Sequence, residues 1–119
     1  MIGIKGKAME VKVRLVERIR RIPSVESFRF TISKKVDFIP GQFMEVIFDK
    51  NKDRSRHFLS FSSSPTKDYI EFTKRISSSE FSQKLEWLKA GDKVLIRMPL
   101  GSCVFRETYK KLSFIKLEE

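Results

Sequence analysis

Hydrophobic and polar residues alternate along the first third of the chain with the period of a β-strand. In MEVKVRL (9–15), four apolar residues are separated by charged ones, and a period of two over this length predicts a strand with one buried face. Pro23 ends this pattern. In VESFRFTI (25–32), apolar residues alternate with arginine and threonine, which predicts a second strand beside the first, as a hairpin or an antiparallel neighbour.

Four further segments carry strand patterns separated by turn residues. Pro40 and Gly41 form a turn signal, because proline presets φ and glycine accepts a positive φ. Polar loops separate the segments that follow. The predicted strands are FMEVIFD (43–49), RHFLSFSSSP (56–65), YIEFTKRI (69–76) and KVLIRM (93–98).

One segment, residues 80–89, has the spacing of an amphipathic helix. Its apolar positions lie three and four apart and are Phe81, Leu85 and Leu88, with Trp87 beside them. Ser79 is placed as the N-cap and Gly91 as the stop signal. The pattern therefore predicts a single helix between the fifth and sixth strands.

Together these elements predict an all-β domain. Six short antiparallel strands and one helix are typical of a small closed barrel, and we expect a six-stranded antiparallel Greek-key barrel with one capping α-helix. Closure would hide the strand edges that an open sheet leaves unpaired. A chain of 119 residues suffices for one domain but not for two, so 1–119 is predicted to be a single barrel domain with its core in 9–105.

Charge narrows the class of partner. The 25 lysines and arginines outnumber the 15 acidic residues, which gives a net charge of +10. This charge favours an anionic partner, whether nucleic acid, an acidic protein or a phosphorylated cofactor. It also fits a solvated, lysine-rich surface, because the basic residues are scattered rather than gathered in one stripe.

Residues that form disulfides or bind metals are scarce. Cys103 and His57 are the only cysteine and histidine, so the sequence predicts neither a disulfide framework nor a metal site, and fits a reducing cytoplasm. No apolar run approaches the roughly 20 residues that span a bilayer, and the N-terminus lacks the apolar region of a secretory signal. We therefore expect a cytoplasmic protein without a membrane span.

Catalysis by side chains alone has little support in the sequence. There is no Ser-His-Asp set in a suitable order, no HExxH and no glycine-rich phosphate loop. No acid partner for His57 can be identified, so it is interpreted as a structural or surface histidine. A site for a flat, anionic cofactor fits the remaining residues better.

The segment RHFLSFSSSP combines the groups that such a cofactor needs. Arg56 is able to bind a diphosphate through two N–H groups, and Phe58 to lie against a planar ring. The serines at 60, 62 and 63 are suited to hydrogen-bond a heteroaromatic edge. A second element, SSSEFS, opens the helix, where free N–H groups and the hydroxyls of Ser79 and Ser82 favour anions. Taken alone, SSSEFS is interpreted as an ordinary helix cap, and the serine strand also has a purely structural interpretation.

The order of these motifs resembles the N-terminal flavin-binding barrel of the ferredoxin–NADP reductase superfamily. The motifs are PGQF, an arginine–aromatic–serine strand ending in SSSP, then EFTKRI, a helix-opening serine motif, LKAGDKV and MPLGS. The resemblance covers residues 9–105. It implies a ferredoxin reductase-like fold that binds FAD or FMN, with FAD the more common cofactor in the family.

The resemblance also implies roles for the strand residues. In the family, an arginine binds the flavin diphosphate, an aromatic ring two residues later stacks on the isoalloxazine, and the next hydroxyl lies near flavin N5. Arg56 and Phe58 match the first two roles, but Leu59 then occupies the place of the hydroxyl. Sliding by one residue makes Ser60 the neighbour of N5 and leaves His57 in the place of the arginine. A β-bulge would satisfy both, and the hypothesis keeps Arg56 and Ser60, with Phe58 or Leu59 against the ring and Ser60 as the catalytic group.

Two further segments match family motifs. Thr73, Lys74 and Arg75 match the strand that lines the flavin. Residues 79–82 match its glycine-x-x-serine phosphate motif, with Ser79 in place of the glycine and Ser82 conforming. Residues 98–101 match a glycine-proline-x-glycine turn that is also one glycine short.

In the family a second, NAD(P)H-binding domain follows the barrel, and we expect it to be missing from this chain. Residues 110–119 are interpreted as the start of that missing domain or as a tail, because no G-x-G-x-x-G follows. We expect the flavin-binding domain of an NAD(P)H-dependent flavin oxidoreductase, with hydride transfer from nicotinamide to flavin N5, and no turnover of NAD(P)H by this chain alone. The alternatives are a basic barrel that binds nucleic acid, and a docking module for an acidic redox protein without flavin. Nucleic acid is the less expected partner, since no strand shows an exposed aromatic pair flanked by basic residues.

Overall fold

In the computed structural model, residues 8–101 are described, and they form six β-strands and one α-helix. The strands are β1 (Met9–Ile22), β2 (Val25–Thr31), β3 (Phe43–Ile47), β4 (Arg56–Ser60), β5 (Tyr69–Arg75) and β6 (Lys93–Leu100). The helix α1 spans Glu80–Glu86, and one 3₁₀ turn spans Asp53–Ser55. Cys103 and the segment 110–119 lie outside the described residues. The predicted all-β class with a single helix is confirmed.

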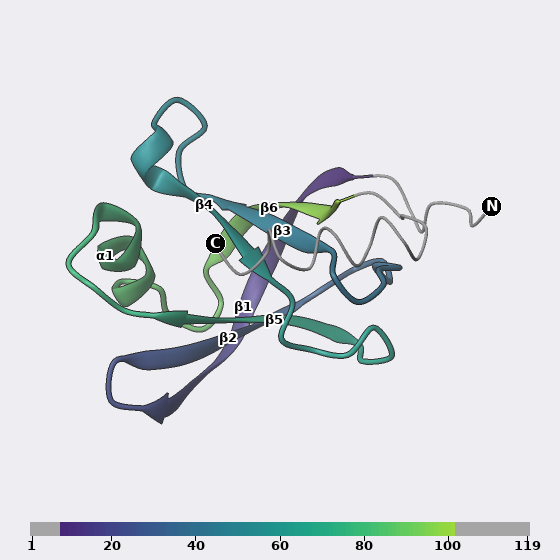
Figure 1. Ribbon diagram of the computed structural model, residues 1–119, viewed down its shortest axis with the longest axis horizontal. Coiled ribbons are helices and arrows are strands. Elements are labelled where there is room, and N and C mark those ends of the chain that lie inside the picture. Colours follow the sequence, from purple (N-terminus) through teal and green to yellow (C-terminus); the bar gives the residue numbers. More distant parts are fainter. Residues whose placement is uncertain (1–7, 102–119) are drawn as a thin grey trace.

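All strand pairs are antiparallel, in the order β4-β3-β6-β1-β2-β5 (Figure 1). β6 is the last strand of the described chain, and it lies between β3 and β1. The long connection from β5 to β6 is of the Greek-key kind. β1 is twice as long as the predicted 9–15 segment. Its first half pairs with β6 and its second half with β2, with irregularities between Leu15 and Glu17 and between Arg20 and Ile22. These irregularities interrupt the period of two, which is why the alternation ended before the strand did.

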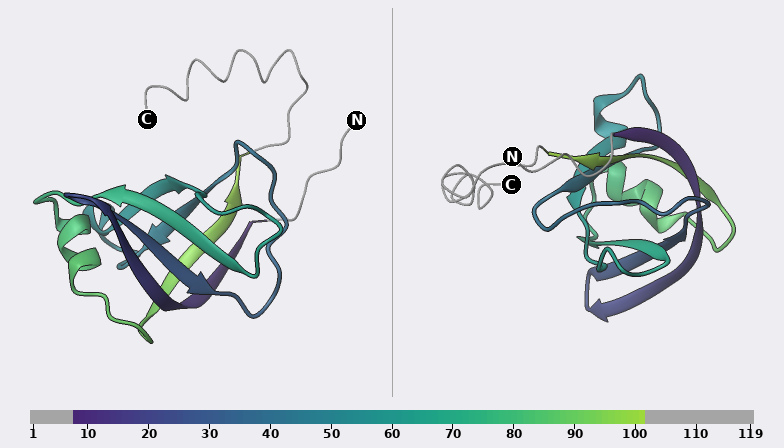
Figure 2. Two further views of the ribbon diagram at one scale, coloured as in Figure 1. Left: turned by 90° about the horizontal axis from the view of Figure 1, so that it is seen from below. Right: turned by 90° about the vertical axis from the view of Figure 1, so that its right-hand side faces the viewer.

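The sheet curls into a barrel that its backbone ladders do not fully close (Figure 2). β4 and β5 are the two ends of the strand order. They are joined beyond Ser60 by the Ser62 N–H, which donates to the Glu71 carbonyl at 2.8 Å, and by the Ser63 hydroxyl, which accepts from the Glu71 N–H at 3.0 Å. The predicted fourth strand therefore ends five residues early, because a side chain replaces the backbone in this junction.

The core is built on phenylalanines. Phe72 stacks between Phe28 and Phe30, with ring centroids 5.3 and 5.6 Å apart, and all three are fully buried. Phe81, Leu85 and Leu88 close one end of this core, as the helical spacing predicted. Trp87 does not join them: it is the C-cap residue just beyond the end of the helix and is 72% exposed.

The helix is held at both ends. The Ser79 hydroxyl accepts from the Ser82 N–H, which confirms the predicted N-cap. At the other end, the Arg18 guanidinium of β1 donates to the carbonyls of Glu86 and Leu88 at 3.0 and 2.8 Å. The helix stops at Glu86 rather than at the predicted residue 89. Gly91 follows with a φ of 98°, the left-handed geometry that glycine allows. No helix among residues 8–101 is long and apolar enough to cross a bilayer.

Candidate functional site

The two unpaired strand edges define a seam on the barrel. β4 pairs only with β3, and β5 only with β2, among residues 8–101. The Ser62–Glu71 junction joins the edges at one end, and α1 lies at the end of the barrel away from the start of β1 (Figure 2). We call the edge formed by His57–Ser60, Thr73–Arg75 and the turn 77–82 the β4–β5 seam. It carries most of the predicted site residues.

At the helix end of the seam, β4, β5 and α1 meet at His57. Its ring centroid lies 5.2 Å from that of Phe81 of α1, with the rings tilted by 41°. Partial burial lowers the pKa of His57 below its usual value, and the positive charge of Lys74 on β5 lowers it further. The pKa of Lys74 is lowered too, by burial alone. Its ammonium donates to the Arg75 carbonyl at 3.0 Å.

Arg56 points to the opposite face of β4 from His57, because neighbouring side chains alternate across a strand. Its Nε donates to Glu45 Oε2 at 2.8 Å and its Nη2 to Glu45 Oε1 at 3.1 Å. Its Nη1 donates to the Lys50 carbonyl at 2.9 Å. All three guanidinium nitrogens are therefore engaged within the protein.

Glu45 holds a second arginine in the same way. Arg97 Nη2 of β6 donates to Glu45 Oε1 at 2.9 Å, and the Glu45 carboxylate is 5% exposed. The hydrogen bond from Arg56 is the main cause that lowers the pKa of Glu45, against the opposing effect of burial, and Arg97 adds to it. The same pairing raises the pKa of Arg56. Glu45 was not predicted as a partner, although a lone carboxylate inside the apolar run FMEVI indicates a basic neighbour.

Three further predicted residues lie away from His57. Phe58 is 53% exposed and meets Phe43 edge-on, with ring centroids 5.7 Å apart. Arg75 is exposed. On the outer face of the sheet, the Thr73 hydroxyl donates to the Ser62 hydroxyl at 3.0 Å and is also hydrogen-bonded to the Ser27 hydroxyl, with 2.7 Å between the oxygens.

Ser60 borders a cleft beside the serine-rich segment, with a volume of about 330 Å³. The cleft is lined by the loop 38–42 and by Ser60, Phe61, Ser63 and Pro65. Phe38 stacks on Phe61 with centroids 3.8 Å apart, and Gln42 ties the loop down by donating to the Gly101 carbonyl at 2.6 Å. No local pattern indicated that Phe38 packs here, because the two rings are far apart in the sequence.

The serines before α1 bond chiefly to one another. The Ser82 hydroxyl accepts from the Ser77 N–H at 3.0 Å, and the Ser77 hydroxyl donates to that of Ser79 at 3.2 Å. The carboxylate of Glu80 accepts from the Ser55 hydroxyl at 2.7 Å, so the 3₁₀ turn is also fastened to the helix. These contacts explain the helix start; a role of Ser79 and Ser82 toward an anion stays a prediction.

A family model for the oxidoreductase FAD-binding domain matches residues 12–105 of the sequence. This chain belongs to that family. The predicted ferredoxin reductase-like fold and its cofactor, FAD, are thereby confirmed, and flavin is favoured over nucleic acid.

Solved structures share the fold of this FAD-binding domain. The ferredoxin reductase in carbazole 1,9a-dioxygenase has a TM-score of 0.71 and 20% identity, over 83% of this chain and 30% of that one. A ferredoxin–NADP⁺ reductase from Neisseria gonorrhoeae with bound FAD and NADP has a TM-score of 0.67 and 18% identity, over 83% and 40%. The cytochrome b5 reductase domain of Ulva prolifera nitrate reductase has a TM-score of 0.66 and 20% identity, over 78% and 40%.

The FAD-binding domain thus spans well under half the length of these structures. No curated protein matches its sequence significantly.

The residues of the seam fit FAD by their chemistry. Lys74 and His57 are basic groups of the kind that bind phosphates, Leu59 has an apolar surface, and the Ser60 hydroxyl is of the kind that hydrogen-bonds a heteroaromatic edge. Thr73 already uses its hydroxyl with Ser62 and Ser27. The 330 Å³ cleft at Ser60 is within the usual range of ligand pockets. Residues 8–101 contain no cluster of His, Cys, Asp or Glu that could hold a metal.

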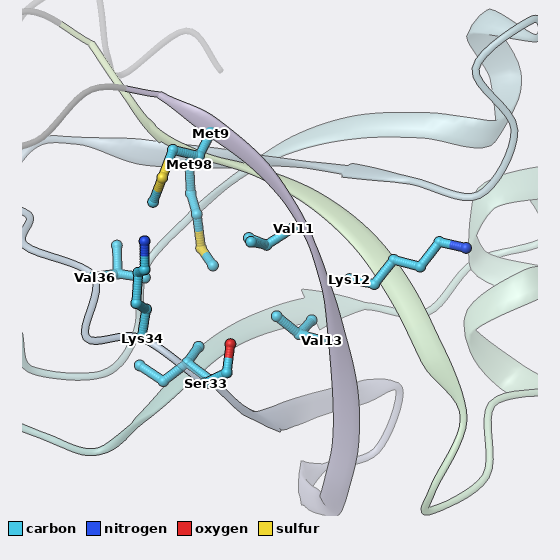
Figure 3. Close-up of a pocket in the computed structure, with 9 residues that line it drawn as sticks. Met9, Val11, Lys12, Val13, Ser33, Lys34, Val36 and Met98 are labelled. Atoms are coloured by element: carbon cyan, nitrogen blue, oxygen red, sulfur yellow. The ribbon is translucent and has the colours of Figure 1, made fainter.

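Another pocket lies at the start of β1, at the opposite end of the barrel from α1. Its volume of about 20 Å³ admits little more than a water molecule. Figure 3 shows apolar side chains such as Val11 and Met98 around it, while Lys12 turns away. It is too small and too apolar for a nucleotide. A further cleft of about 370 Å³ lies between β1, β3 and β6, beside Lys12, Lys50 and Lys93, so the seam is the candidate site because of its residues and not because of its volume.

Proposed function

We propose that this chain holds the FAD of an NAD(P)H-dependent flavin oxidoreductase along the β4–β5 seam. One observation carries the proposal: two unpaired strand edges hold a histidine that packs on Phe81, a half-buried lysine and a ligand-sized cleft in a domain of the FAD-binding family. The cleft at Ser60 suits the flavin ring. The helix end of the seam, at His57 and Lys74, suits the phosphates.

The protein's part in the reaction is to hold and orient the cofactor. FAD, when bound, supplies hydride and electron transfer chemistry. Ser60 is placed to offer a hydroxyl to the redox-active edge of the ring, and is the catalytic group of this proposal. Leu59 packs against the core from the same strand, whereas Phe58 lies on the other face beside Phe43, the face that Ser60 shares. Both stay candidates to support the ring.

The two predicted alignments of the strand motif differ in the residue that meets the phosphates. Glu45 and the Lys50 carbonyl each take N–H groups of the Arg56 guanidinium, one from each of its three nitrogens, so a diphosphate at Arg56 would compete with a buried carboxylate. His57 lies beside α1 without such a partner. This supports the alignment in which Ser60 follows Leu59 and His57 takes the place of the arginine.

The partners belong to the same proposal. A separate nicotinamide-binding domain would supply hydride, so this FAD-binding domain is not expected to turn over NAD(P)H alone. The net charge of +10 suits an acidic redox protein as the electron acceptor in the cytoplasm.

The test is an absorbance spectrum of the purified chain after mixing with excess FAD and desalting. Flavin bands should persist in the wild type and disappear in Ser60→Trp, whose indole fills the cleft from an exposed position. The matched control is Ser33→Trp, an exposed serine beside the small pocket at the other end of the barrel. A colourless wild type, or equal retention by both tryptophan variants, would contradict the proposed site.

A further inference from the structure

The outer face of the sheet at β1 and β6 carries three basic side chains on adjoining positions. Arg14 of β1 lies directly opposite Lys93 of β6. Lys12 lies opposite Leu95, so it is the diagonal neighbour of Lys93 on the same face. Diagonal neighbours on a strand pair are typically about 7–8 Å apart. In Figure 3 the Lys12 side chain turns away from the apolar pocket inside the barrel.

These three cations have no acidic partner that neutralises them. Among residues 8–101, no carboxylate lies within ion-pair distance of Lys12, Arg14 or Lys93. Arg14 donates to the Gly91 carbonyl at 3.0 Å, whereas both lysines are exposed. Like charges directly opposite one another on a strand pair are destabilising. An anion bound beside them would relieve this repulsion, so this face favours a negatively charged ligand.

The two lysines border a cleft whose floor is apolar. The cleft lies between β1, β3 and β6, with a volume of about 370 Å³, which is in the range of ligand pockets. Leu95 and Ile47 line it and lie opposite each other on β6 and β3. Neither belongs to the main core cluster, and Leu95 is only half-buried. The cleft therefore combines positive charge with an apolar surface.

The remaining wall of the cleft is the segment 48–50, which follows β3. The Lys50 ammonium pairs with Glu10 of β1 at 2.7 Å, which holds it beside the cleft. Asp49 is the acidic residue of the lining, and its carboxylate accepts from the Asn51 N–H at 2.9 Å within its own turn. Because these contacts already order the wall, little binding free energy would be lost to ordering it.

We propose that this cleft binds a small phosphate monoester with an apolar body. Near neutral pH such a group carries almost two negative charges and three acceptor oxygens, which suits ammonium groups that act as point charges. A planar carboxylate is better matched by the fork of an arginine, and the cleft is lined by lysines. Lys12 and Lys93 bind the phosphate, and the apolar body lies on Leu95.

The site goes beyond the proposed function, because none of its lining residues belongs to the β4–β5 seam. It lies on β1, β6 and β3, whereas the seam is formed by the two strands at the ends of the strand order. The cleft and the seam are therefore testable separately, with different ligands and different variants.

The probe is phenyl phosphate, and its two fragments, inorganic phosphate and phenol, lack the apolar ring and the charge respectively. Amide shifts of the isotope-labelled chain are followed by NMR at about pH 7.5, where the monoester is mainly a dianion. Phenyl phosphate should shift the amides of Lys12, Lys50 and Lys93–Leu95 in a saturable way, and should bind about fivefold or more tightly than either fragment. Shifts confined to the seam, no saturable shift, or equally tight binding of inorganic phosphate would overturn the proposal.

Lysine variants test which charges bind the phosphate. Lys12→Gln and Lys93→Gln should each weaken phenyl phosphate binding about two- to fivefold, and the double variant about tenfold. Both remove a repulsive charge, so neither should unfold more easily than the wild type. Lys67→Gln, an exposed lysine in the loop between β4 and β5, is the matched control and should keep the wild-type affinity. An equal loss in all three single variants would show attraction by net charge alone and would overturn the site.

FAD separates the cleft from the proposed function. The Lys12→Gln/Lys93→Gln double variant should retain FAD like the wild type, and Ser60→Trp should bind phenyl phosphate like the wild type. Loss of FAD from the double variant would mean that the cleft is part of the FAD site, which would overturn this inference. A wild type that binds phenyl phosphate in the cleft but retains no FAD would support the cleft and contradict the proposed function alone.

Discussion

Glu45 binds Arg56 of strand β4 and thereby competes with any other anion for this arginine. It lies on β3, between β4 and β6, and its carboxylate accepts hydrogen bonds from both Arg56 and Arg97. A buried carboxylate needs such partners, because an unpaired charge in the interior is strongly unfavourable. The three side chains form one cross-strand unit on the outer face of the barrel.

Replacing Glu45 with glutamine should lower the free energy of unfolding by about 1–3 kcal/mol. The amide keeps the shape but removes the charge that both arginines share; their partial exposure keeps the loss below that of a fully buried pair. Urea unfolding measures the difference. Glu10→Gln removes the exposed pair of Glu10 with Lys50 and, as the control, should change stability by less than about 0.5 kcal/mol.

The same carboxylate predicts an acid dependence of stability. Its folded-state pKa is lowered by Arg56 and Arg97, so its contribution is present above the pKa of the unfolded chain and is lost as the pH falls through the folded-state pKa. The gap in unfolding free energy between the wild type and Glu45→Gln should therefore shrink from pH 7 towards about pH 3. A gap that is constant over this range would contradict the assignment.

At this scale the sequence indicated candidate site residues but not the faces on which their side chains lie, and their roles stay predictions. Ser60, Thr73 and Lys74 follow from the order of motifs, but Arg56 and His57 are neighbours and alternate faces. Which of the two faces the seam depends on the position of Glu45 on a neighbouring strand. That pairing is set by the register of β3 against β4, which no local pattern of the sequence reveals.

The element that most affects the site is the short helix. α1 has seven residues, too few to be stable alone in water. Its start depends on Ser79, and its buried face on Phe81 and Leu85. Phe81 also supports His57, so the helix and the seam are coupled.

Replacing Ser79 with alanine should cost about 1 kcal/mol, because the Ser82 N–H loses its acceptor. Thermal or urea unfolding measures this loss. Ser78→Ala is the matched control: the hydrogen bond at Ser78 is made by its backbone carbonyl, which accepts from Gln83, so this variant should stay within about 0.5 kcal/mol of the wild type. Equal effects of the two variants would mean that Ser79 is not the operative cap.

Helix and strand types were predictable from periodicity, whereas their ends were not. The helix was expected to reach residue 89 and stops at Glu86, where Arg18 of β1 takes up its carbonyls. β1 was expected to stop near Leu15 and runs to Ile22 by exchanging one partner strand for another. In both cases a contact distant in sequence sets the boundary.

For the whole molecule, the incomplete closure of the barrel is the feature that connects fold and function. A closed barrel was the natural expectation from six short strands, since it removes unpaired edges. The structure keeps two edges unpaired and joins them beyond Ser60, where Ser62 and Ser63 bond to Glu71 and Thr73 of β5. Whether two strands that are distant in sequence pair or stay apart is decided by the global geometry of the sheet, not by either strand's own pattern.

FAD should stabilise the domain, because a ligand that binds only the folded state adds its binding free energy to stability. At a free concentration 100 times its dissociation constant, the gain is about 2.7 kcal/mol, which corresponds to a rise in melting temperature of roughly 10–20 °C for a domain of this size. Thermal unfolding with increasing FAD measures it. AMP, which lacks the flavin ring, should give a much smaller rise at equal concentration, and an equal rise would contradict binding of the ring.

Arg18 links the β1–β2 hairpin to α1. Besides the helix carbonyls, its guanidinium binds Glu26 of β2 at 2.8 Å and lies over the ring of Phe28. The β1–β2 hairpin and α1 are therefore expected to open together, as one cooperative unit. Amide hydrogens of α1 should exchange as slowly as those of the hairpin even without cofactor. A nucleotide that arrives at the seam then meets a helix that is already ordered, and little of its binding free energy is lost to ordering the protein.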